Sequence, residues 1–173
     1  MTDPFARLNE WHDFYAAVAG ISATLIGLLF VGLALNPAIM ADRSPAGLRT
    51  WAGQTFHSFL MVLTIGLLAL IPGPGPHSFG LPLVIVAGLG LFRLLRDAAR
   101  ARHDPDPAWR GRLLMRFAVP LAGYATALWV GIAALRGDPS AVRWLVASIF
   151  LLMMNATENC WDLLKEIGDR HEG

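Results

Sequence analysis

Residues 144 to 166 read WLVASIFLLMMNATENCWDLLKE, and this stretch decides what must surround it. Its first half is uniformly apolar, as in a membrane-spanning helix, whereas amides and carboxylates enter its second half before the apolar residues end. On a helix these polar side chains share one face, formed by Ser148, Asn155, Glu158, Asn159, Asp162 and Glu166. Because a carboxylate in hydrocarbon costs several kcal/mol unless it meets water or a partner, we expect this face to point inward, toward other helices.

The composition of the whole chain is that of an integral membrane protein. Apolar residues make up 55% of the 173 residues and charged residues only 16%, whereas soluble domains carry about 25% charged residues. The length allows four or five spans of about 20 residues, so we expect residues 1–173 to form one all-α transmembrane helical domain. The single cysteine, Cys160, excludes an intrachain disulfide and a cysteine-rich metal site.

Five apolar segments predict five transmembrane helices, at about residues 14–35, 51–71, 78–95, 117–135 and 144–165. The second ends at Pro72, where the Pro- and Gly-rich sequence up to Pro76 excludes regular structure. The third is the shortest, because Arg93 interrupts its apolar run. A four-span chain whose third segment is short or re-entrant is therefore the alternative.

The first span carries small residues on one side. Ala16, Gly20, Ala23 and Gly27 follow the small-xxx-small spacing that lets the backbone of another helix come close. Two interpretations stay open for this helix-packing face. It contacts another helix of the same chain, or it forms a seam between the subunits of a homo-oligomer.

Part of the same span resembles a known group of membrane proteins. The residues concerned are FYAAVAG at 14–20, ATLIGLLFV at 23–31 and LN at 35–36. They resemble the opening helix of small uncharacterised bacterial polytopic inner-membrane proteins, some of which are labelled as modulators of the membrane protease FtsH. The resemblance is confined to this helix, and it implies a bacterial cytoplasmic membrane but no catalytic or binding residue.

The distribution of lysine and arginine predicts how the spans are oriented. With five spans, eleven of the fourteen basic residues fall on the side that holds residues 93–116 and the carboxy terminus. Positively charged loops resist translocation, so this side is expected to be cytoplasmic. The chain is thus predicted to be a multi-pass protein of the inner membrane, with its amino terminus outside and its carboxy terminus in the cytoplasm.

In this orientation the polar residues of the spans lie at similar depths. At about 1.5 Å per helical residue they fall within a layer of about 10 Å in the cytoplasmic half, which allows direct or water-mediated contact. We expect a polar cluster, or the lining of a pore, formed by Gln54, His57, Arg93, Asn155, Glu158, Asn159 and Asp162.

Two functions without chemistry fit this cluster. In the first, Arg93 or His57 neutralises Glu158, the cluster holds the helices in register, and the protein is a homo-oligomeric accessory or regulatory subunit of the membrane. In the alternative, copies of the chain form a cation-conducting ion channel, lined by Asn155, Glu158, Asn159 and Asp162. The partners expected are the lipid bilayer, further copies of the chain and another membrane protein.

Enzymes and cofactor proteins have little support in the sequence. The chain contains no His-Glu-x-x-His pair, no Gly-x-Ser-x-Gly elbow and no Gly-rich phosphate loop, so we expect no catalytic residue, metal or cofactor. An enzyme using His57 as a base and Glu158 as an acid, or a proton-coupled transporter using the same pair, stays as a minor alternative.

The arginines between Arg93 and Arg116 predict topology rather than nucleic-acid binding. Aspartates interrupt the basic segment, and it has a single aromatic residue, Trp109, on which a base could stack. Attraction to anionic lipid headgroups is the natural addition to the topological role.

Overall fold

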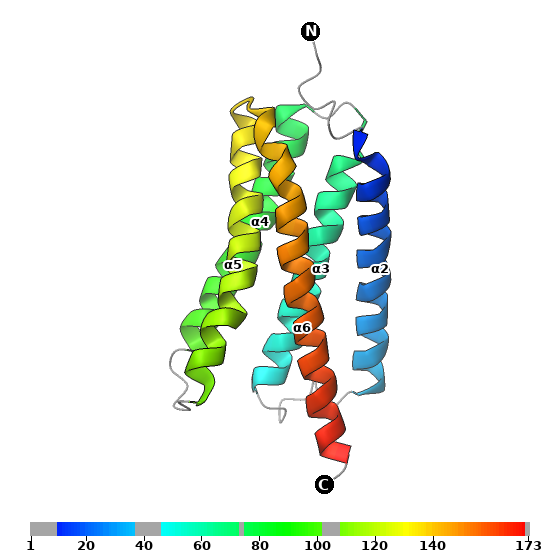
Figure 1. Ribbon diagram of the computed structural model, residues 1–173, viewed down its shortest axis with the longest axis vertical. Coiled ribbons are helices and arrows are strands. Elements are labelled where there is room, and N and C mark those ends of the chain that lie inside the picture. Colours follow the sequence, from blue (N-terminus) through cyan, green and yellow to red (C-terminus); the bar gives the residue numbers. More distant parts are fainter. Residues whose placement is uncertain (1–9, 37–45, 73–74, 102–107, 172–173) are drawn as a thin grey trace.

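The computed structural model describes residues 10–36, 46–72, 75–101 and 108–171. They form an up-and-down bundle of five long helices (Figure 1), namely α2 (His12–Leu35), α3 (Ala46–Ala69), α4 (Pro76–Ala101), α5 (Ala108–Leu135) and α6 (Leu145–His171). A short 3-10 helix, η2 (Pro139–Trp144), leads into α6. All five long helices are long and apolar enough to cross a membrane, so the predicted all-α, multi-pass membrane protein is confirmed.

The third span is a full-length helix. α4 passes through Arg93 without a break and ends at Ala101, as the absence of a helix-breaking residue predicts. Its apolar window runs over Pro76–Arg100, so the four-span alternative is not needed. α3 and α5 begin before the apolar segments that predicted them, because hydropathy marks the part of a helix in lipid and not its polar extension.

The turn between α5 and η2 is built from local backbone chemistry. Gly137 adopts a φ of 80°, the left-handed conformation that ends a helix, and its N–H donates to the carbonyl of Ala134. Asp138 then caps η2, because its Oδ1 accepts a hydrogen bond of 2.9 Å from the backbone N–H of Ser140. Both contacts allow α6 to return antiparallel to α5.

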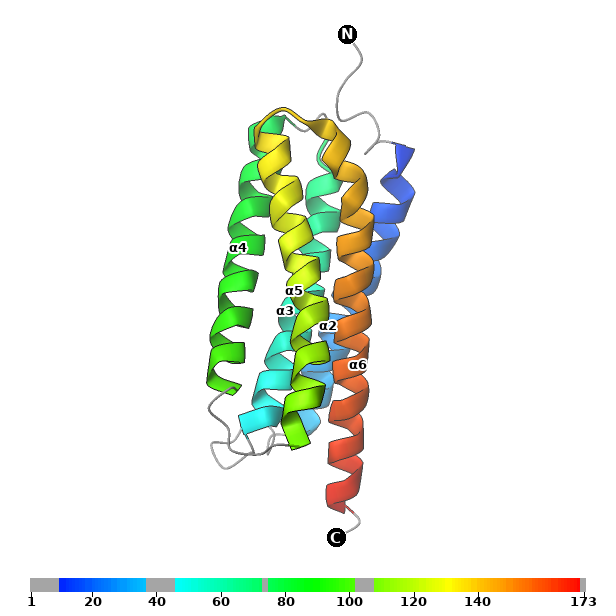
Figure 2. The ribbon, with the colours of Figure 1, turned by 60° about the vertical axis from the view of Figure 1, so that its left-hand side comes forward.

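Four helices enclose the core, and the fifth lies outside them. α3, α4, α5 and α6 pack in a ring, each against the next, whereas α2 packs against α3 (Figure 2). The interior is filled by large apolar side chains, among them Phe59, Phe79, Met61, Ile65, Leu83, Leu145, Ile149 and Leu152. The ends of α2, α4 and α6 and the starts of α3 and α5 lie together at the lower end of the bundle in Figure 1.

Glycines allow the helices to approach closely at two contacts. A Cβ atom added to Gly80 of α4 would lie 2.9 Å from the carbonyl oxygen of Gly131 on α5. One added to Gly66 of α3 would lie 2.9 Å from the Cβ of Ala19 on α2. Close packing of this kind holds helices together in lipid, where apolar side chains gain nothing by leaving the solvent.

Candidate functional site

The first pair of predicted site residues joins α3 to α4. Arg93 donates from Nη1 to Nε2 of His57, whose Nδ1 lies 2.6 Å from the carbonyl oxygen of Gly53. An arginine can only donate, so Nε2 accepts, and Nδ1 carries the proton that is donated to Gly53. His57 therefore has both ring nitrogens engaged, and its role here is to position Arg93.

A cavity of about 630 Å³ opens beside this pair, between α3, α4 and α5. We call it the basic cavity, and its charged and amide lining consists of Gln54, His57, Arg93, Arg96, Asp97 and Arg100. The lining thus holds three guanidinium groups and one carboxylate, and Arg96 Nε lies 4.0 Å from Asp97 Oδ1. The cavity therefore has an excess of positive charge.

Gln54 is the most unusual residue of the lining. Only 8% of it is exposed, and neither Nε2 nor Oε1 has a hydrogen-bond partner. A buried amide without partners is unfavourable, because it loses its hydrogen bonds to water and gains none in exchange. Gln54 belongs to the lining of the cavity, and its amide carries two N–H donors and one acceptor oxygen that no described residue uses.

Tyr124 closes the cavity on the side of α5. Its ring packs against Gly90 of α4, where any side chain would overlap the ring. Its hydroxyl lies near that of Ser58, and the Ser58 hydroxyl accepts a hydrogen bond of 3.4 Å from Nδ2 of Asn155. A polar chain therefore joins α5, α3 and α6 across the bundle.

The amides and the serine of the α6 stripe face the interior. Ser148 donates a hydrogen bond of 2.8 Å to the carbonyl oxygen of Gly123 on α5. Asn155 and Asn159 are each 2% exposed. Ser148 thus connects α6 to α5, and Asn155 connects it to Ser58 of α3. The side chain of Glu166, at the end of the predicted stripe, lies outside the described residues.

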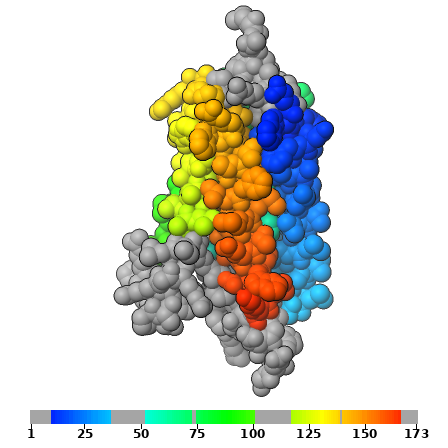
Figure 3. All heavy atoms as spheres, viewed as in Figure 1, coloured from blue at the N-terminus to red at the C-terminus, as the bar shows by residue number. Residues whose placement is uncertain are grey.

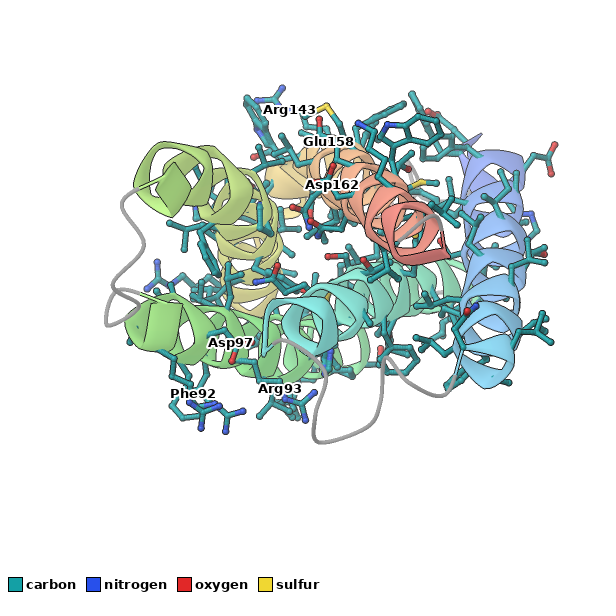
Figure 4. All side chains as sticks on the ribbon, turned by 90° about the horizontal axis from the view of Figure 1, so that it is seen from below. Phe92, Arg93, Asp97, Arg143, Glu158 and Asp162 are labelled. Atoms are coloured by element: carbon teal, nitrogen blue, oxygen red, sulfur yellow. The ribbon has the colours of Figure 1, made fainter. Side chains whose placement is uncertain are left out.

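The inward orientation expected for Glu158 is wrong. Its side chain is exposed, and it lies on the outer face of α6 with Met154 and Trp161. Figure 3 shows that no other coloured helix covers the outer surface of α6, drawn orange to red, and Figure 4 shows Glu158 far from Arg93. The buried arc of α6 is centred on Leu152, about 60° from Asn155, because Leu145, Ile149 and Ala156 also need burial. Around the helix, Glu158 lies about 60° from Asn155 in the opposite direction. Asp162 lies between Asn155 and Glu158 and is half-buried.

The small-residue face of α2 has no neighbour among the described residues. Ala16, Gly20, Ala23 and Gly27 are all exposed, and a Cβ added to Gly20 or Gly27 would meet no atom within 4 Å. The helix packs on α3 through its other side, which carries Tyr15, Val18, Ala19, Ser22 and Leu29. Of the two interpretations of this face, packing within the chain is therefore not seen.

The basic cavity contains part of the predicted polar cluster and some residues that the sequence did not indicate. Gln54, His57 and Arg93 lie together as expected, whereas Asn155 reaches them only through Ser58. For Arg96 and Arg100 the sequence indicates a topological role and attraction to lipid headgroups, but no cavity. Their place in the cavity is indicated by Gly90, Arg93, Asp97 and Arg100, which recur at helical spacing and so mark one face of α4. Tyr124 was missed, because a single tyrosine in an apolar span gives no comparable signal.

The comparisons with known proteins add no relative. No family model, curated protein or solved structure matches this chain.

Proposed function

We propose that this protein is a non-enzymatic accessory subunit of a bacterial cytoplasmic membrane, and that it assembles with further copies of itself through α2. The observation that carries the proposal is the open face formed by Ala16, Gly20, Ala23 and Gly27. Among the described basic side chains, Arg93, Arg96, Arg100 and Lys165 lie toward the lower end of the bundle, against Arg136 and Arg143 at the other end, which supports placing the lower end in the cytoplasm.

The composition of the rest of α2 supports a second copy as the occupant of this face. On another side of the helix, turned about 110–130° from this face, α2 exposes Ile21 and Leu28, which suit contact with lipid chains. Phe30 flanks the small-residue face, and its ring contacts Phe56 of α3. A lipid-facing surface has no need of a strip of alanine and glycine, whereas an identical helix can approach closely along it. The small-residue face is also uncharged, so two copies can meet along it without burying a charged side chain.

Binding is favoured over chemistry by the surroundings of the two residues that could move a proton. His57 uses one ring nitrogen toward Gly53 and the other toward Arg93. Glu158 lies on the outer face of another helix, so the two cannot act on one substrate. The two interactions of His57 are those of a structural residue.

Cysteine cross-linking tests the assembly. In a Cys160→Ser background, Ala23→Cys places a thiol on the small-residue face, and Leu28→Cys is the matched control on the lipid-facing side of the same helix. In membranes treated with oxidant, we expect Ala23→Cys to give a disulfide-linked dimer in at least fivefold higher yield than Leu28→Cys. Equal yields, or a higher yield for Leu28→Cys, would refute assembly through this face.

The cation-channel alternative has weaker support. Asn155 and Asn159 are enclosed by the helices of their own chain, and Glu158 is on the outside, so the stripe does not line one path. In planar bilayers we expect no cation current from the purified protein at any voltage or pH. A current that Glu158→Gln abolishes would establish the alternative.

A further inference from the structure

We infer that the basic cavity binds a phosphate ester that carries hydroxyl groups, and that its source is the headgroup of an anionic membrane lipid. This inference rests on the cavity alone and does not depend on whether copies of the chain associate through α2. Charge, the orphaned amide of Gln54 and the apolar surface beside the cavity carry it in turn.

The charge of the lining selects an anion. Arg93, Arg96 and Arg100 extend from one face of α4, and Asp97 offsets only one of the three. Guanidinium groups bind phosphate oxygens with two parallel hydrogen bonds, and they are the side chains used most often for this purpose. The contact with His57 occupies only one nitrogen of Arg93 and holds the rest of the group in place.

Gln54 adds a requirement that a simple anion does not meet. Its Nε2 can donate to a phosphate oxygen, but its Oε1 needs a donor, and inorganic phosphate at neutral pH has few to offer. A hydroxyl group on the ester would supply that donor. The amide atoms are buried, whereas Arg93, Arg96 and Arg100 are exposed, so a ligand that reaches the amide must enter deeper than the guanidinium groups and displace the side chains that cover it.

The outer surface of α4 supports a lipid as the source of the ester. Phe92 and Leu95 alternate with the arginines along this helix and are 64% and 53% exposed, respectively. Figure 4 shows Phe92 and Arg93 on the outer edge of α4, with Asp97 between α4 and α3. A lipid whose acyl chains lie on this apolar surface would bring its phosphate to the cavity, close to where headgroups lie in a bilayer.

The test uses the full-length protein in uncharged detergent, stripped of lipid, with two probes. The probes are short-chain phosphatidylglycerol and glycerol 3-phosphate, and short-chain phosphatidylcholine serves as the zwitterionic control. Affinity is measured by native mass spectrometry for the lipids and by isothermal titration calorimetry for the soluble ester. We expect phosphatidylglycerol to bind at least tenfold more tightly than phosphatidylcholine.

Variants distinguish a site from general attraction to a basic surface. Arg96→Gln combined with Arg100→Gln removes two exposed charges from the cavity, and Arg136→Gln combined with Arg143→Gln removes two from the opposite end of the bundle. We expect the first pair to weaken phosphatidylglycerol binding at least tenfold and the second to change it less than twofold. Gln54→Leu should weaken it at least threefold, although it removes no charge.

Each outcome bears on the inference. Equal losses from the two arginine pairs, or no effect of Gln54→Leu, would overturn the site and leave only surface attraction. Binding of glycerol 3-phosphate with the same dependence on the variants, without a preference for phosphatidylglycerol, would support the phosphate-ester site but reject the lipid as its source. Dimer formation by Ala23→Cys is measured separately, so neither result decides the other.

Discussion

The orphaned amide of Gln54 makes a prediction of unusual sign, namely that replacing a polar residue in the lining of the site stabilises the protein. Leucine has nearly the volume of glutamine and keeps the helical geometry of α3. In the ligand-free protein, Gln54→Leu removes two buried polar atoms that have no partners. No hydrogen bond within the described residues is lost with them.

The expected gain follows from the cost of an unsatisfied polar group. Leaving one buried donor or acceptor without a partner costs about 1–3 kcal/mol, so relieving the amide should raise the free energy of unfolding by about 2 kcal/mol. Ser148→Ala is the matched control, because that buried hydroxyl donates to the Gly123 carbonyl. Its loss should lower the free energy of unfolding by about 0.6 kcal/mol.

The assay is equilibrium unfolding by sodium dodecyl sulfate in mixed micelles, followed by far-ultraviolet circular dichroism, with all lipid removed. Phosphatidylglycerol is then added, and we expect it to stabilise the wild type more than Gln54→Leu. A loss of more than about 1 kcal/mol in lipid-free Gln54→Leu would refute the reasoning, because it would mean that the amide has partners.

Three further predictions concern the bundle itself. Gly80→Ala should lower the free energy of unfolding by about 1–3 kcal/mol, because the new methyl group meets the Gly131 carbonyl. Gly88→Ala is the control on the same helix: its new methyl group meets no atom, so the free energy of unfolding in the same assay should be equal or higher. A double-mutant cycle of Asn155→Leu and Ser58→Ala should give a coupling of about 0.6 kcal/mol, and a coupling near zero would show that their hydrogen bond contributes nothing. Hydrogen bonds from Ser140 lower the pKa of Asp138 below its ordinary value of 3.8, so its stabilising contribution is present above pH 3.8 and lost as the pH falls through the lowered pKa; unfolding measured against pH should show this loss in the wild type and not in Asp138→Asn.

The spans could be predicted because lipid leaves few choices. A segment such as Phe14–Leu35, without a charge, can satisfy its backbone groups in hydrocarbon only as a helix, so hydropathy alone locates it. Hydropathy says nothing about the polar ends of a helix. The span expected at 117–135 agrees with the apolar window Phe117–Leu135, but α5 itself begins at Ala108, and α4 continues to Ala101, beyond the span expected at 78–95.

The sequence predicts the depth of the polar residues in the membrane, but not the direction in which each helix turns its polar face. Counting residues from the ends of the spans brought Gln54, His57 and Arg93 to one level, where they lie together. The direction in which a helix turns its polar face depends on its neighbours, and those are decided by tertiary packing. For α6 the apolar residues around Leu152 took the interior, so Glu158 was left on the outside.

The central claim, that copies of this chain meet along α2, is tested most directly by a single-particle structure in lipid nanodiscs large enough for several copies. We expect at least two copies in contact through Gly20 and Gly27, with their α2 backbones close together. A single copy with lipid along this face, or copies that meet through another helix, would contradict it.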